Sequence, residues 1–126
     1  MKIRVLSSED VRQALPMKAA IEECKRAYSR LSNGNVEMPL RSRVHVLEQD
    51  GLLLTMPAAL LEDGEMAVKL VTVFGKNPTR NLPLIHAVVL VLDAENGQVL
   101  SLMDGEVLTA VRTGAGVGAA TDFLAP

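Results

Sequence analysis

The sequence predicts an α+β protein with a largely antiparallel sheet, helices before the sheet and one helix after it. Two helical patterns come first, over residues 8–15 and 16–31. Apolar segments separated by glycine-containing turns then fill residues 40–103, and Asp104 can cap a final helix that runs towards Leu124. Because short turns rather than helices join the successive strands, neighbouring strands are expected to pair antiparallel.

The first third of the chain predicts one strand and two helices. Ile3–Leu6 is a short apolar strand, and Ser7 with Asp10 forms a variant of the capping box, so a short helix should follow and end before Pro16. The second helix has apolar residues at every third or fourth position and stops at Ser32-Asn33-Gly34. Its charged residues are expected to face solvent; they are Lys18, Glu22, Glu23, Lys25 and Arg26.

The middle of the chain follows the two-residue period of strands. Over residues 40–46 the alternation places Arg41, Arg43 and His45 on one strand face. Turn signals then separate further strands; they are Asp50-Gly51, Asp63-Gly64 and Glu95-Asn96-Gly97. The further predicted strands are residues 52–56, 66–74, 84–93 and 98–103, with a polar loop at 75–81.

Composition and charge exclude several classes of protein. The 126 residues are expected to form one domain, and 48% hydrophobic with 22% charged residues is typical of soluble globular proteins. A net charge of −2 argues against nucleic-acid binding, and no apolar run is long enough to predict a membrane span. The lone Cys24 and the lack of a signal-peptide pattern predict a cytoplasmic protein. No metal-binding motif is present.

Three glycines near the end of the chain, Gly114, Gly116 and Gly118, raise the question of a dinucleotide-binding loop. That loop requires G-x-G-x-x-G directly after a strand, whereas here the spacing is G-x-G-x-G within a predicted helix. The glycines are therefore not expected to bind a cofactor phosphate. Close packing of the helix and close approach of a ligand both remain open.

Cations in apolar surroundings are the candidate functional residues. Lys69 lies within the strand-like VKLVTVF, where it is either a buried, functional amine or a solvent-facing residue of an edge strand. His86 is expected to be a hydrogen-bonded core histidine rather than an acid or base. Arg43 and Arg112 could bind a carboxylate through their forked guanidinium groups, and with Lys69 they suggest a site for a small acid.

The chain resembles the ornithine cyclodeaminase/mu-crystallin family over essentially its whole length. The phrase DG-x-x-LTA-x-RTGA at 104–115 and the phrase LP-x-I…D-x-x-x-G at 82–97 carry the resemblance, together with MPLRSRV at 38–44. It implies an enzyme of two domains that exchanges hydride at the α-carbon of an amino acid through an imine. One domain binds the substrate and forms a homodimer, and the other is a Rossmann domain that binds NAD(H) or NADP(H).

The resemblance also implies roles for individual residues. Arg43 matches an arginine that holds the substrate carboxylate, and Lys69 matches the catalytic lysine beside the reacting carbon. Arg112 matches an arginine that contacts both substrate and cofactor. Leu54 stands where ornithine cyclodeaminase has a glutamate near the substrate, and Leu84 where it has a threonine near the cofactor. Alanine dehydrogenase or imine reductase activity therefore stays open beside cyclodeaminase (lyase) activity.

Within this family, residues 1–126 correspond to the substrate-binding and dimerisation domain, and the Rossmann domain is missing from the sequence. The chain is accordingly interpreted as a fragment of an NAD(P)-dependent enzyme that is inactive alone and does not bind the cofactor tightly. The expected partners are a small amino or imino acid and a second copy of the chain. The alternative is a non-catalytic module that dimerises or binds a small carboxylate.

Overall fold

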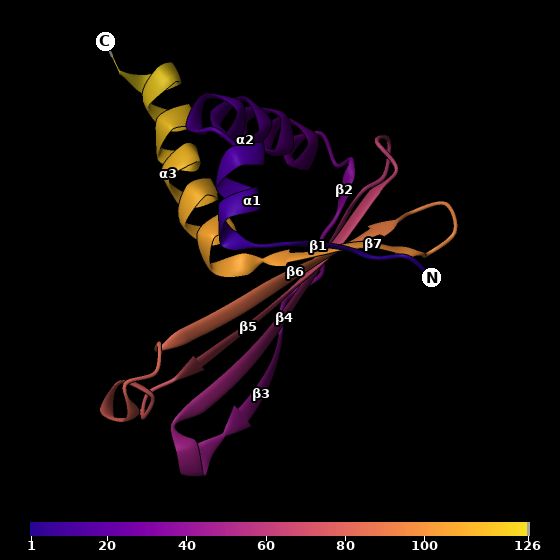
Figure 1. Cartoon of the computed structure of the whole chain (residues 1–126). Coiled ribbons are helices and arrows are strands. Elements are labelled where there is room, and N and C mark those ends of the chain that lie inside the picture. The colour runs from indigo at the N-terminus through magenta and orange to yellow at the C-terminus, as the bar shows by residue number, and fades with distance from the viewer. Residues whose placement is uncertain (126) are drawn as a thin grey trace.

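The computed structural model describes residues 1–125, and within them it contains three α-helices and a seven-stranded sheet (Figure 1). The helices are α1 (Ser8–Ala14), α2 (Met17–Ser32) and α3 (Gly105–Leu124). The strands are β1 (Arg4–Leu6), β2 (Val36–Glu37), β3 (Ser42–Val46), β4 (Gly51–Leu60), β5 (Glu65–Phe74), β6 (Ile85–Asp93) and β7 (Val99–Asp104). Two short 3₁₀ turns complete the chain; they are η1 (Leu47–Gln49) and η2 (Pro78–Arg80). The predicted α+β class is confirmed.

The sheet is antiparallel except at one edge. Its strand order is β1-β7-β6-β5-β4-β2, and β3 pairs with the other half of β4. Only β1 lies parallel to its neighbour, β7, among the pairings described. The two-residue strand β2 was not predicted, because a segment that short carries no recognisable alternation.

Strand β4 is longer than the sequence pattern predicted. The expected strand stopped at Met56, before Pro57, whereas β4 continues through Pro57 to Leu60. Pairing with β3 ends at Thr55 and pairing with β2 begins at Ala59. Pro57 therefore lies between the part of β4 that pairs with β3 and the part that pairs with β2. Its missing backbone N–H costs no hydrogen bond to either outer strand.

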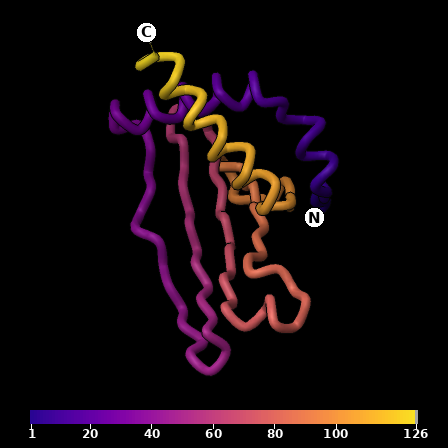
Figure 2. Tube along the Cα trace, turned by 90° about the vertical axis from the view of Figure 1, so that its left-hand side faces the viewer, coloured from indigo at the N-terminus to yellow at the C-terminus, as the bar shows by residue number. Residues whose placement is uncertain are grey.

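The helices lie together on one side of the sheet, and the core fills the space between them (Figures 1 and 2). Strand alternation places Val71 and Val89 on the same face of the sheet as Lys69, and both are buried beneath the helices. The helices contribute the other buried apolar residues of the core; they are Val11, Ala20, Ala115 and Ala119. The opposite face of the sheet is not covered by any helix of residues 1–125.

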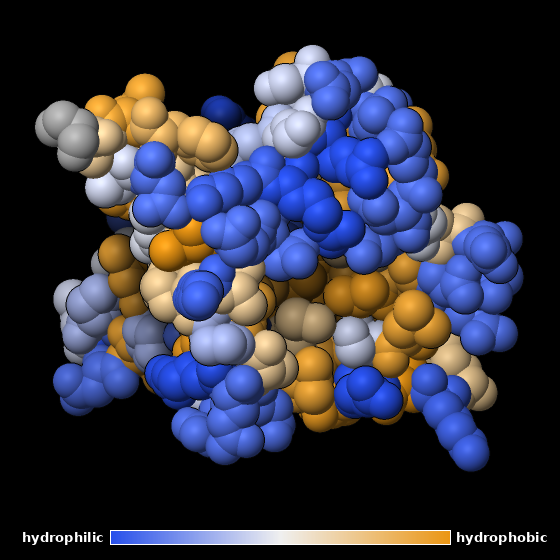
Figure 3. Space-filling view, turned by 90° about the horizontal axis from the view of Figure 1, so that it is seen from above, coloured by the Kyte–Doolittle hydropathy of each residue, from blue (hydrophilic) through white to orange (hydrophobic). Residues whose placement is uncertain are grey.

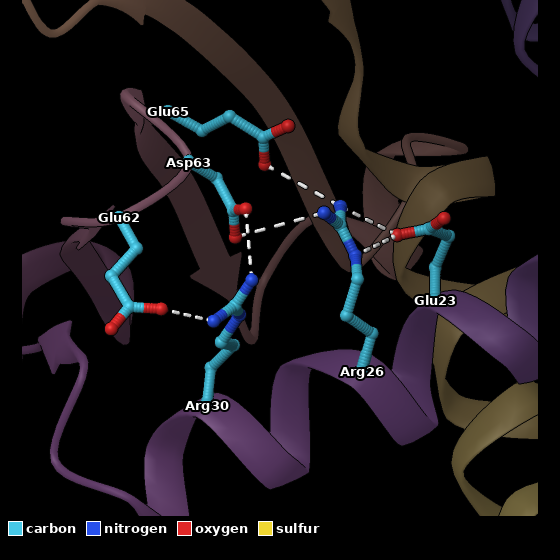
Figure 4. A network of polar contacts seen from close by, with 6 residues as sticks. All are labelled: Glu23, Arg26, Arg30, Glu62, Asp63 and Glu65. Carbon is cyan, nitrogen blue, oxygen red and sulfur yellow. Dashed lines mark hydrogen bonds and ion pairs between the residues drawn. The ribbon is translucent and has the colours of Figure 1, made fainter.

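The β4–β5 turn is fastened to α2 by a cluster of charged residues (Figure 4). Asp63 accepts a hydrogen bond of 3.1 Å from Arg30 and also lies 3.6 Å from Arg26. Arg30 pairs further with Glu62, and Arg26 with Glu23 and Glu65. Glu23 and Arg26 are exposed, as predicted, and Arg26 also approaches Asp63 and Glu65 of the β4–β5 hairpin.

The helical side of the molecule is largely hydrophilic, and apolar residues show beside and between the helices (Figure 3). No helix within residues 1–125 combines the length and the apolar character that crossing a lipid bilayer would require.

Candidate anion-binding site

Strand β5 holds Lys69 in the middle of the sheet. The strand lies between β4 and β6, and Lys69 is paired in register with Met56 on one side and Val89 on the other. The interpretation of an edge strand with a solvent-facing lysine is therefore wrong. Lys69 is half-buried on the helical face, and its Nζ donates a hydrogen bond of 2.9 Å to Oγ1 of Thr109 in α3.

A hollow of about 810 Å³ surrounds this lysine. Its polar lining consists of Arg41, Lys69, Thr109 and Arg112. The rest of the lining is mostly apolar and includes Met38, Leu54, Met56, Ala58, Val71 and Val89. The hollow therefore presents three cations and a hydroxyl above an apolar floor, which is the arrangement that favours a small organic anion.

The electrostatics of the hollow act most directly on Lys69. Burial lowers the pKa of its amine below the usual range, and the positive charges of Arg112 and Arg41 lower the pKa further. A bound anion would offset the repulsion between the three cations. The amine is thus easier to deprotonate than an exposed lysine, which suits a group that exchanges a proton with a ligand.

The two predicted arginines are not placed alike. Arg112 lies on α3, is exposed, and lines the hollow with Lys69. Arg43 lies on β3, paired with Leu54, and by alternation faces the same side as Arg41, which directly precedes β3; Arg43 nevertheless lies outside the lining. The structure brings Arg41 rather than Arg43 together with Lys69 and Arg112.

Sequence reasoning thus missed two residues of the hollow, Arg41 and Thr109. For Arg41 a signal existed, because the alternation over residues 40–46 had already placed it on one strand face with Arg43. For Thr109 the only available signal is its spacing of three residues before Arg112, which puts both on one face of a helix. That spacing alone does not reveal a partner on β5.

The start of α3 fixes the position of Thr109 above Lys69. The Asp104 side chain accepts a hydrogen bond of 2.8 Å from the backbone N–H of Val107 and so caps the helix. Gly105 follows directly, buried against β6; a Cβ there would lie 2.7 Å from the carbonyl carbon of Ala87. The helix can cross the sheet this closely only because residue 105 is a glycine.

The three later glycines of α3 pack against α2. A Cβ on each would meet a side chain of that helix at 3.3 Å or less; the pairs are Gly114 with Met17, Gly116 with Tyr28 and Gly118 with Ile21. Close packing is the confirmed alternative. A dinucleotide loop needs free backbone N–H groups at a helix N-terminus, so these glycines do not fit a cofactor pyrophosphate.

The remaining candidates lie outside the hollow or only support it. The Sγ of Cys24 is half-buried and donates a hydrogen bond of 3.7 Å to the backbone carbonyl of Arg112. His86 was predicted in the core, but its side chain is 51% exposed and its Nδ1 lies 3.3 Å from Glu106. The prediction failed because His86, like Val88, lies by alternation on the face of the sheet opposite Lys69 and so points away from the core.

Comparison with known proteins places this geometry in a family. Residues 1–126 match the sequence model of the ornithine cyclodeaminase/mu-crystallin family. A ketimine reductase mu-crystallin from Macropus fuliginosus is 37% identical over 126 residues, which cover 96% of this chain and 40% of the relative. An alanine dehydrogenase from Archaeoglobus fulgidus is 31% identical over 125 residues, which cover 99% of this chain and 38% of the relative.

Solved structures share the fold. The Δ1-pyrroline-2-carboxylate reductase of Thermococcus litoralis, solved with NADH and L-proline, aligns with a TM-score of 0.91 and 38% identity. It is matched over 98% of this chain and 38% of its own. An archaeal alanine dehydrogenase dimer with bound NAD aligns with a TM-score of 0.90 and 30% identity, over 100% of this chain and 38% of its own. The chain thus spans about 40% of the length of these relatives.

Proposed function

Because the chain belongs to the ornithine cyclodeaminase/mu-crystallin family, we propose that it is the substrate-binding part of an NAD(P)-dependent enzyme that acts on amino or imino acids. The enzyme would exchange hydride at the α-carbon of the substrate through an imine. The observation that carries the proposal is the meeting of Arg41, Lys69 and Arg112 in one hollow on the helical face of the sheet. The relatives named above, which are reductases and dehydrogenases, support reductase or dehydrogenase activity.

The arginines would hold the substrate carboxylate. A guanidinium group can donate two parallel hydrogen bonds to a carboxylate, which fixes both its position and its orientation. Arg112 and Arg41 line the hollow and are the first candidates for this contact. Arg43 lies further along the same face of β3, so we assign it an outer role in attracting the anion.

Lys69 would serve the proton transfers at the imine. Reduction of an imine adds hydride to its carbon and a proton to its nitrogen, and the reverse reaction removes both. Lys69 reaches into the hollow with a lowered pKa, so its ammonium can donate the proton and its amine can take the proton back. NAD(H) or NADP(H), bound by a part of the enzyme outside residues 1–126 and close to Arg112, would supply the hydride chemistry.

The chain would also form a homodimer. The sheet face opposite Lys69 is apolar and not covered by any helix of residues 1–125, and a face of this kind marks an interface. Its residues include Leu53, Val68, Leu70, Val88 and Leu90. The half-buried thiol of Cys24 fits a reducing compartment, so we place the enzyme in the cytoplasm.

A second candidate function follows from the same hollow. Its three cations also fit a module that binds a small carboxylate without catalysis. Such a module would bind the acid through the same arginines. The two candidates differ in whether the enzyme transfers hydride.

The test is substrate-dependent formation or consumption of NAD(P)H by a full-length protein that contains this chain. Lys69→Met is expected to lower kcat by about a hundredfold or more, and Arg112→Met to raise KM. Arg12→Met, which removes an exposed arginine from α1, is the matched control and should leave both constants unchanged. Carboxylate binding without any turnover would favour the module, and the chain of residues 1–126 alone is expected to show no turnover.

A further inference from the structure

Two turns of the chain contain an asparagine followed by a glycine. Asn33-Gly34 directly follows the last residue of α2, and Asn96-Gly97 lies between β6 and β7. In such a pair the backbone nitrogen of the glycine can attack the side-chain amide carbon of the asparagine, because glycine has no Cβ to obstruct the ring that forms. The new bond displaces the amide nitrogen as ammonia, which takes the proton of the glycine N–H. Water then opens the resulting cyclic imide to aspartate or isoaspartate.

The other asparagines of the sequence are poorly suited to this reaction. In Asn77-Pro78 the proline nitrogen carries no proton and cannot form the imide. In Asn35-Val36 and Asn81-Leu82 the side chain of the following residue crowds the attacking nitrogen. The two Asn-Gly pairs are therefore the candidates for deamidation.

The two pairs are matched in most respects. Both asparagines and both glycines are exposed. Gly34 and Gly97 have the same φ of 76°, and a Cβ built on either would meet nothing within 4 Å. Exposure, backbone conformation and steric room at the glycine therefore do not distinguish the pairs. A difference in reactivity has to come from the hydrogen bonds of each turn.

The side chain of Asn96 is held at both ends of its amide group. Its Nδ2 donates a hydrogen bond of 3.0 Å to Oδ2 of Asp93, and its Oδ1 accepts one of 2.9 Å from the backbone N–H of Gln98. The backbone N–H of Gly97 donates a hydrogen bond of 2.8 Å to the carbonyl of Asp93. These bonds have to break before the amide carbon can meet the glycine nitrogen, so the folded turn protects Asn96.

Asn33 lacks these restraints. Its backbone N–H donates a hydrogen bond of 3.0 Å to the carbonyl of Ser29, but its exposed side chain forms no hydrogen bond within residues 1–125. The backbone N–H of Gly34 donates to the carbonyl of Leu31 at 3.2 Å, a longer contact than that of Gly97. Helix ends also fray. The amide of Asn33 is thus free to rotate towards the nitrogen of Gly34.

We propose that Asn33 is a site of spontaneous deamidation and that the folded turn protects Asn96 from the same reaction. The products are aspartate and isoaspartate at position 33. Either one places a carboxylate at the C-terminus of α2, where the helix dipole opposes a negative charge. Isoaspartate also lengthens the main chain by a single carbon.

The modification would act on the connection between α2 and the sheet. The backbone N–H of Asn35 donates a hydrogen bond of 3.0 Å to the carbonyl of Arg30, and this bond spans the modified residue. Leu31 and Val36, on either side of it, line an apolar hollow of about 560 Å³ between α2 and the sheet. A longer main chain at residue 33 therefore alters the segment that carries both of these lining residues.

The experiment compares the two turns within one protein. The full-length protein that contains this chain is incubated in its folded state in a mildly alkaline buffer, and peptide mapping by mass spectrometry follows the conversion of each asparagine. We expect Asn33 to deamidate at least about tenfold faster than Asn96, because two side-chain hydrogen bonds must first break at Asn96. Equal rates, or a faster reaction at Asn96, would overturn the inference.

The same protein unfolded in urea is the first control. Each asparagine is followed by glycine, so without the folded turns the two sites should deamidate at similar rates. If the tenfold preference for Asn33 persisted in urea, local sequence would explain it and the structural argument would be refuted. Conversion in urea without any conversion of Asn33 in the folded protein would refute it as well.

A pair of variants tests the protection of Asn96. Asp93→Ala removes the carboxylate that holds Nδ2 and should raise the rate at Asn96 by at least about threefold, with no change at Asn33. Glu95→Ala removes another carboxylate from the same turn but none of the hydrogen bonds of the Asn96 side chain, and it should change neither rate. Equal effects of the two variants would contradict the role of Asp93. The comparison within the wild-type protein does not depend on the folding of either variant.

Discussion

Lys69 shows how a single charged residue is kept within an apolar sheet. Its neighbours in register are Met56 and Val89, and neither can pair with an ammonium group. Instead, Nζ of Lys69 donates a hydrogen bond to the hydroxyl of Thr109 on α3. A hydroxyl accepts from an ammonium and donates to a neutral amine, so this contact serves Lys69 in both protonation states.

Replacement of Thr109 should reveal its role in positioning Lys69. Thr109→Val keeps the shape of the side chain and removes the hydrogen bond, so kcat is expected to fall by about tenfold. A charge-assisted hydrogen bond favours the ammonium form of Lys69, so its loss should lower the pKa. The limb of the pH–rate profile that reflects the ionisation of Lys69 should therefore move to lower pH. Thr109→Ser should restore both kcat and the pH profile. A purely structural role would lower stability without moving the pH limb.

The lowered pKa of Lys69 predicts a pH dependence of stability. The pKa in the folded protein lies below the unfolded value of about 10.4, so between these two values the unfolded chain binds a proton that the folded chain has released. The free energy of unfolding should therefore rise with pH across this window. Below the window the folded state bears the full cost of the buried charge, and above it the cost is absent.

Lys69→Met removes this titration and the buried charge together. The variant is expected to be more stable than the wild type at pH 7, and its advantage should shrink as the pH rises towards about 10.4. Urea unfolding of both proteins between pH 7 and pH 10.5 measures the difference. A difference that stays constant over this range would refute the explanation.

At the scale of elements, α3 decides where the site forms. Its first residue, Gly105, lies against the backbone of β6, and its later glycines lie against α2. The helix is thereby held close to both the sheet and the neighbouring helix. Thr109 and Arg112 come within reach of β5 as a result, so packing at the helix start controls the geometry of the hollow.

Two glycine-to-alanine substitutions in α3 should have opposite effects. In Gly105→Ala the new Cβ would lie 2.7 Å from Ala87 and 2.8 Å from Val88 backbone atoms, which cannot yield, so the loss should be about 1–3 kcal/mol. In Gly114→Ala the new Cβ would meet only the flexible end of Met17 at 3.3 Å, and better helix propensity should add up to about 1 kcal/mol. Chemical denaturation of both variants measures this, and two losses of equal size would contradict it.

At the scale of the whole molecule, the sheet is covered on one face only. The helices and the cationic hollow occupy one side, and the other side presents aliphatic residues of the central strands. A two-sided division of this kind separates the proposed substrate site from the proposed dimer interface. A mutation in the proposed substrate site should therefore leave the proposed dimer interface intact, and a mutation in the interface should leave the site intact.

The uncovered face predicts self-association that a single charge should weaken. Val88 lies on this face, on β6, and is 37% exposed, so Val88→Lys can be accommodated in the folded chain. Sedimentation is expected to show a dimer for the wild type and a shift to monomer, by at least about tenfold in Kd, for Val88→Lys. Val117→Lys adds the same charge to an exposed valine on α3 and should leave the dimer intact. A wild type that stays monomeric at high concentration would contradict the assignment of the interface.

Most of the helices and strands could be predicted from the sequence, because their signals are local. The capping box of Ser7 and Asp10, the three-to-four-residue period of α2 and the glycine turns each depend on residues only a few positions apart. The sequence also excluded a dinucleotide loop at Gly114, Gly116 and Gly118, since the spacing and the context of these glycines are wrong for such a loop. Lys69 stood out because it interrupts an apolar strand.

Which residues meet in the hollow depends on long-range packing, which the sequence pattern does not reveal. Alternation over residues 40–46 placed Arg41 and Arg43 on one face, but only the folded chain brings Arg41, which precedes β3, into the hollow with Lys69 and Arg112. The contact between Thr109 and Lys69 joins residues 40 positions apart, and no local pattern encodes it. His86 lies outside the core for the same reason: burial depends on what packs above a strand, and the strand's own sequence does not contain that information.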